Sequence, residues 1–114
     1  MPSQNESLRD LQSTLIRQLK KLHDSLDDVT DANLAQTITR EMAEVNHRIA
    51  IVGGLIFTSE SQELVDKLDA VKKASRKVNT AIANLKKLQA FLDAVSEFLG
   101  LVDEAIDIAK SVAL

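Results

Sequence analysis

Glu44 and His47 are the two side chains whose types and spacing come closest to a chemical site in this sequence. A carboxylate and an imidazole three residues apart share one face of a helix, and helical bundles present di-iron ligands in this way. Such a site needs a second pair facing the first, but the other histidine, His23, has no glutamate three residues before it. Both residues also lie off the apolar stripe of their segment, which favours the surface. We therefore expect no metal or cofactor. If a metal site did exist, Glu44 and His47 would be its candidate ligands.

Nucleophilic and phosphate-binding chemistry have no clear pattern of residues here. The chain contains no cysteine, which excludes thiolate catalysis and disulfides. Its serines can be matched with a histidine and an acid only by free choice, so no ordered triad is indicated. The Gly53-Gly54 pair lacks the spaced glycines, the lysine and the preceding strand of a phosphate-binding loop. We expect that the protein is not an enzyme.

Composition limits the class of protein and of partner. The 114 residues, 45% hydrophobic and 27% charged, are typical of one globular domain. A net charge of −3 and only three aromatic residues argue against nucleic acid as a partner, although residues 72–87 carry six bases and no acid. Residues 1–7 contain neither a basic nor an apolar stretch, so we expect no signal peptide and a cytoplasmic location.

Two helices are predicted from apolar residues that recur every three or four positions. One stripe runs through residues 8, 11, 15, 19, 22, 26 and 29, and the other through 34, 38, 42, 45, 49, 52 and 56. They predict helices over about 7–28 and about 31–57, with Ser7 as the N-cap of the first and Thr30 or Asp31 as that of the second. The short polar link makes these helices antiparallel neighbours.

The second half of the chain predicts one long helix. Residues 60–99 contain no glycine or proline and follow a capping-box pattern at 59–62, so we expect a single helix of roughly 60 Å there. A break, if there is one, is expected at 78–80. Ser75 and Gln89 interrupt the apolar stripe of this helix, where a polar residue either fixes helix register or, more commonly for serine, bonds its own backbone.

Gly100 stands where a glycine cap would end the long helix. A short fourth helix, or a kinked continuation of the third, is then expected over about 101–113. The predicted fold class is all-α, an antiparallel bundle of three to four helices with a long third helix. Residues 1–114 form one domain.

Self-association is predicted from the apolar residues beyond position 85. The first two helices are too short to cover the whole of the long third one, and the later apolar residues lie on a second side of it. We expect a homodimer or higher oligomer. The expected interface consists of Leu88, Phe91, Leu92, Val95, Phe98, Leu99, Val102 and Ile106.

Charge is sorted along the same half of the chain. Residues 72–87 are basic, whereas residues 93–107 carry five acids and no base. Antiparallel pairing of two such segments would place opposite charges together and help to fix their orientation. The alternative is that both blocks are simply solvated helix faces.

Two functions follow from these patterns. The first is a non-catalytic interaction module that binds copies of itself, or another protein helix, through its C-terminal helices. The second is a membrane-active protein, because residues 49–57 form a run without a polar side chain that is too short to span a bilayer but long enough to insert shallowly. A buried helix end is the favoured explanation of that run. The candidate membrane-contact residues are Ile51, Val52, Leu55, Ile56 and Phe57.

Overall fold

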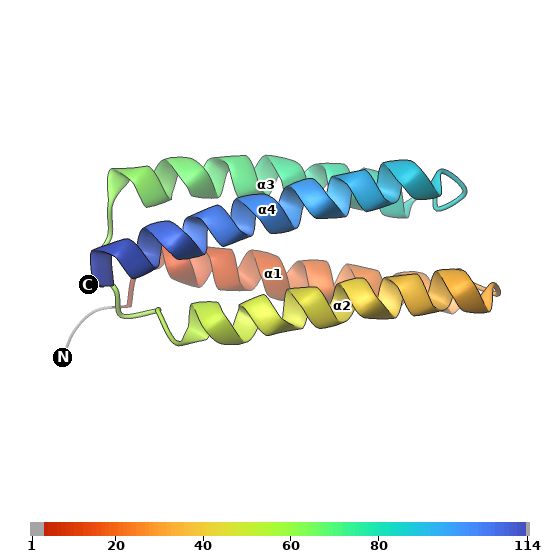
Figure 1. Cartoon of the computed structure of the whole chain (residues 1–114), viewed down its shortest axis with the longest axis horizontal. Helices are drawn as coiled ribbons and strands as arrows, with labels where there is room; N and C mark the ends of the chain where they lie inside the picture. The colour runs from red at the N-terminus through yellow and green to blue at the C-terminus, as the bar shows by residue number, and fades with distance from the viewer. Residues whose placement is uncertain (1–3, 114) are drawn as a thin grey trace.

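Four helices pack side by side in the computed structural model of the chain, which describes residues 4–113 (Figure 1). The helices are α1 (Glu6–Ser25), α2 (Ala32–Gly53), α3 (Gln62–Ile82) and α4 (Leu88–Ala113), and a single 3-10 turn, Leu26–Asp28, follows α1. The molecule measures 48 × 22 × 17 Å, so the helices run along most of its length. The predicted all-α bundle is confirmed.

The bundle consists of two antiparallel hairpins, α1 with α2 and α3 with α4 (Figure 1). Between the hairpins, α1 packs on α3 and α2 packs on α4, and the second of these seams is the sparser. The order around the bundle is therefore α1, α2, α4, α3. It follows that the α1–α3 seam and the α2–α4 seam lie on opposite sides of the molecule.

Side-chain caps fix where three of the helices begin. Asn5 Oδ1 accepts from the Leu8 amide at 3.0 Å, and Asp31 Oδ1 accepts from the Leu34 amide at 3.0 Å. Asp31 was one of the two expected caps. Ser7, the cap expected for the first helix, instead lies buried inside α1.

The third helix begins two residues later than its capping-box pattern predicts. Ser61 is the cap, and its Oγ accepts from the Leu64 amide at 3.2 Å. The Glu60 side chain is used elsewhere, because its Oε2 accepts from the Ser7 amide at 3.2 Å. Glu60 thus ties the start of α3 to the start of α1.

The expectation of one helix over 60–99 is wrong, since the chain reverses direction at residues 83–87. The Asn84 amide donates to Ala81 O at 3.0 Å and the Lys87 amide donates to Asn84 O at 3.2 Å, which closes a tight turn. Gly100 neither caps nor breaks a helix but lies inside α4, so the separate helix over 101–113 does not exist. The reversal contains no glycine or proline, and it forms because folding α4 back onto α3 buries the apolar side of both helices.

This reversal also corrects the predicted interface. Phe91, Val95, Phe98, Leu99, Val102 and Ile106 are all buried in the core of the same chain. Leu92 is half-buried, and Leu88 alone of the eight residues is 40% exposed. The apolar surface that one copy was expected to leave uncovered is therefore the core face of α4.

The opposite charge blocks meet within one chain. Lys77 Nζ of the basic block lies 3.3 Å from Glu97 Oε1 of the acidic block. Lys67, which precedes the basic block, has its Nζ 2.9 Å from Glu104 Oε2. Both pairs join α3 to α4. Antiparallel pairing of the basic and acidic segments is thus a property of the second hairpin.

Candidate functional site

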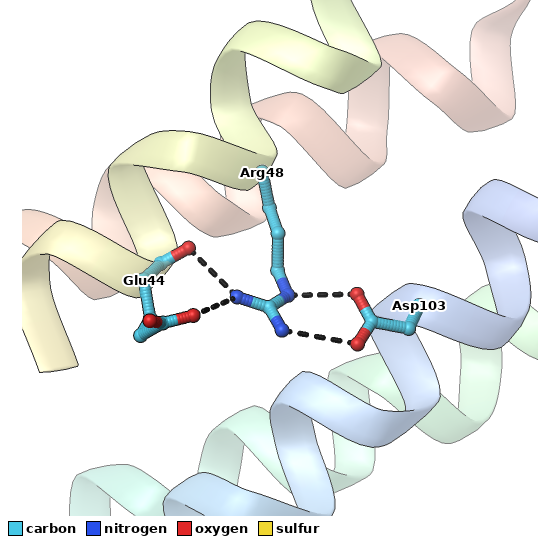
Figure 2. Close-up of polar contacts among 3 residues, drawn as sticks. All are labelled: Glu44, Arg48 and Asp103. Carbon is cyan, nitrogen blue, oxygen red and sulfur yellow. Dashed lines mark hydrogen bonds and ion pairs between the residues drawn. The ribbon is translucent and has the colours of Figure 1, made fainter.

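Glu44, one of the two candidate metal ligands, takes part in an ion-pair bridge between α2 and α4 (Figure 2). Arg48 donates from Nη1 to Glu44 Oε2 at 3.0 Å, and from Nε and Nη2 to the two oxygens of Asp103 at 2.8 and 3.0 Å. The hydrogen bonds to Asp103 are the main reason that the pKa of Arg48 is raised. The bridge holds together the sparser of the two seams between the hairpins.

The second candidate ligand, His47, is exposed on α2 and takes no part in this bridge. Among residues 4–113, no three histidine, aspartate, glutamate or cysteine side chains gather into a group that could hold a metal ion. Glu44 therefore belongs to a structural ion-pair network in this fold.

The five candidate membrane-contact residues differ in their exposure. Val52 is fully buried in the core, whereas Phe57 is 58% exposed and the other three are half-buried. The loop that carries Phe57 is held by Asn5. The backbone nitrogen of Asn5 donates to Ile56 O at 2.7 Å, and its side-chain Nδ2 donates to Thr58 O at 2.8 Å. In the described part of the chain, none of the helices is long and apolar enough to cross a membrane.

The seam between α1 and α3 contains a polar cluster at its centre. Gln18 is only 1% exposed. Its Oε1 accepts from Ser75 Oγ at 2.8 Å, and its Nε2 donates to Asn79 Oδ1 at 3.2 Å. Because burying an unpaired amide is costly, these bonds fix the register of α1 against α3.

Above this cluster lies an open hollow of about 280 Å³, which we call the α1–α3 trough. It is lined by Thr14, Arg17, Gln18, Lys21, Lys72, Ser75, Arg76 and Asn79. Four of these residues are cations, two from each helix and four residues apart on it, so that each pair shares one helix face. Their positive charge contrasts with the net charge of −3 of the whole chain.

Three of the four cations form no ion pair with another described residue. Lys72 forms an ion pair with Asp10. Within residues 4–113, Arg17, Lys21 and Arg76 are in no ion pair. The trough therefore presents positive charge that the fold itself leaves unneutralised.

The trough continues toward the end of the bundle that holds the two hairpin turns. Beyond Lys21 and Asn79 it passes two acids, Asp24 and Asp28, and opens into a larger hollow between the turns. The apolar side chains of this end hollow are Val29, Leu34, Ile82 and Leu85. Asp28, Asp31 and Lys86 also line it. The cationic trough is thus continuous with an end hollow that is lined by apolar and by acidic side chains.

Sequence reasoning found only half of this site. The basic block at 72–87 is visible in the sequence, but Arg17 and Lys21 join it only because α1 packs beside α3. Ser75 was the available signal, since fixing register was one of the two roles expected for a polar residue in the apolar stripe. The position of its partner, Gln18, is decided by tertiary packing.

Comparison of the chain with protein families, with curated proteins and with solved structures gives no match. The chemistry of the trough therefore follows from its own residues. Guanidinium and ammonium groups above amide and hydroxyl groups bind carboxylates and other oxyanions.

Proposed function

We propose that this protein is a non-catalytic interaction module that binds an acidic helical segment of a partner protein in the α1–α3 trough. The observation that carries the proposal is the row of four cations, Arg17, Lys21, Lys72 and Arg76, along one open seam. Carboxylates four residues apart on a helix repeat about every 6 Å, the same rise that separates the two cations on each helix of the trough. A straight acidic helix therefore matches the charges of the trough.

The apolar side chains of the end hollow add binding free energy that the exposed charges alone do not provide. Exposed ion pairs contribute about 0 to 1 kcal/mol each, so four of them mainly set orientation and the rate of association. A leucine-sized side chain buried against Val29, Leu34, Ile82 and Leu85 adds about 1.5 to 3 kcal/mol. The expected ligand is an acidic helix with one large apolar residue near its end.

A labelled synthetic peptide tests the proposal by fluorescence anisotropy. The probe is an alanine-based helix with glutamates four residues apart on one face and a leucine at one end, and its control carries glutamines instead. We expect the acidic peptide to bind, and its affinity to fall as salt is raised because the charges are exposed. The variant Lys21→Glu with Arg76→Glu reverses two trough charges and should weaken binding about tenfold or more.

The matched control reverses two charges outside the trough. Lys20 and Lys73 are exposed neighbours of the trough residues that do not line it, so Lys20→Glu with Lys73→Glu changes the net charge equally. Affinity in this control should stay within about twofold of the wild-type value, apart from a small long-range charge effect. Equal loss in both variants, or equal binding of the glutamine peptide, would contradict a specific trough.

A second candidate function is contact with a membrane surface, favoured by the exposed ring of Phe57 beside half-buried Leu55 and Ile56. Such contact would be shallow, because Val52 is part of the core and reaches lipid only if the bundle opens. Flotation with zwitterionic liposomes tests it, with Phe57→Ser as the variant. Wild-type protein that floats while Phe57→Ser stays at the bottom supports membrane contact, and no flotation of either removes it.

A further inference from the structure

We infer that the acidic helix bound in the α1–α3 trough is α4 of a second copy of this chain. This inference rests on the proposed function of the trough and names its partner. The partner surface is the outer face of α4, defined here as Asp93, Ser96, Glu97, Gly100, Asp103, Glu104 and Asp107, all of which are exposed.

The outer face of α4 has the charge that the trough lacks. Five of its seven residues are acids, and no base occurs from residue 88 to 109. Three of the five, Glu97, Asp103 and Glu104, form exposed ion pairs with α2 or α3 of their own chain. Asp93 and Asp107 stand one heptad to either side of Gly100 and so form the centre line of the face. Neither of these two carboxylates is in an ion pair within the described chain. They are therefore available to cations of another molecule.

The spacing of apolar and charged residues also matches between the two surfaces. On α4, Leu88 is 40% exposed and precedes Asp93 by five residues, about 8 Å along a helix. In the trough, Ile82 of the end hollow follows Arg76 by six residues, about 9 Å. A second α4 antiparallel to α3 thus brings Leu88 to the end hollow and Glu97 opposite Lys72 when Asp93 lies opposite Arg76. Asp107, 14 residues beyond Asp93 and so about 21 Å further along the helix, then lies past the end of the trough.

Gly100 adds an independent observation. It lies exposed in the middle of α4, where glycine lowers helix stability by about 1 kcal/mol relative to alanine. A Cβ atom at this position would meet no described atom within 4 Å, so no contact inside one copy requires glycine. The missing side chain instead allows another backbone to approach α4 closely, as a helix lying in a trough must do.

The geometry makes this contact head-to-tail. The trough lies on the α1–α3 side of the bundle, whereas α4 belongs to the opposite α2–α4 side. Each copy that binds another through its trough keeps its own α4 free. The contact therefore builds a ring or an open row of copies rather than a two-fold dimer.

Sedimentation velocity at low ionic strength tests the inference. Wild-type protein should sediment as species larger than the 12.5 kDa chain, and raising the salt should dissociate them. Two neutralising variants each remove one side of the contact, namely Lys21→Gln with Arg76→Gln in the trough and Asp93→Asn with Glu97→Gln on α4. Each variant alone should associate about tenfold more weakly than wild type.

Mixing the two variants gives the sharpest outcome. The intact α4 of the trough variant still fits the intact trough of the α4 variant, so the mixture should form a dimer of two 12.5 kDa chains and nothing larger. A second test uses the variant Gly100→Leu. The space around residue 100 is open within one chain, so this variant should stay folded but no longer assemble. Wild-type protein that remains a monomer while the synthetic acidic peptide still binds would overturn this inference and leave the proposed function standing. Assembly that neither neutralising variant weakens would also overturn it, whereas failure of the peptide test would remove the proposed function.

Discussion

Replacing Phe98 by alanine separates a core position from an interface position. The side chain is fully buried inside one chain and packs in the same core as Leu15, which is also fully buried. Removing a buried phenylalanine ring costs about 3 to 5 kcal/mol, through lost transfer free energy and the cavity that remains. Since domains of this size are stable by on the order of 5 to 15 kcal/mol, the loss is a large share of the total.

Urea unfolding followed by circular dichroism measures the effect, at two protein concentrations that differ widely. We expect Phe98→Ala to lower the midpoint strongly and by the same amount at both concentrations, because the contact lies within one molecule. Phe57→Ala is the matched control, since it removes the same ring from a site that is 58% exposed, and it should change stability by less than about 0.5 kcal/mol. If Phe98→Ala kept the midpoint of wild type and only reduced the sedimenting mass, Phe98 would belong to an interface and the described core would be wrong.

Three further substitutions probe the seams and the helix faces. Gln18→Ala removes the centre of the polar cluster and leaves its two partners unsatisfied, so urea unfolding should show a loss of about 1 to 3 kcal/mol. Gly100→Ala should raise the unfolding free energy of the monomer by about 0.5 to 1 kcal/mol, because the new methyl group meets no other atom; a loss would show that the helix is not continuous there. Burial, with a smaller contribution from the carboxylate of Glu44, raises the pKa of Glu41. The fold therefore loses stability as pH rises from the unfolded to the folded pKa of this carboxyl, and Glu41→Gln should raise the thermal midpoint at neutral pH but not at a pH below both values.

The Arg48 bridge and the α1–α3 trough show two different uses of charge in this bundle. Arg48 is largely buried and joined to Asp103 by two hydrogen bonds, so its charge is satisfied where α2 meets α4. The cations of the trough lie on the opposite side of the bundle, and only Lys72 among them forms an ion pair within residues 4–113. Satisfied charge stabilises a seam, whereas unsatisfied charge is left for a ligand.

Local sequence determined that the chain is helical and where several of its helices lie. The recurrence of apolar residues every three or four positions defines a helix face whatever the neighbours are, which is why α1 and α2 were predicted close to their observed bounds. Asp31 capped the expected helix for the same reason, since its carboxylate reaches an amide only three residues away.

Tertiary structure alone decided where α3 ends and what α4 faces. Residues 83–87 contain no residue that breaks a helix by itself, and they turn because the reversed chain buries Phe91 and Phe98. The trough depended on the same long-range packing, because Arg17 and Arg76 are distant in sequence and meet only when α1 lies beside α3. Periodicity marks the apolar side of a helix, but the free energy of the whole bundle selects what covers that side.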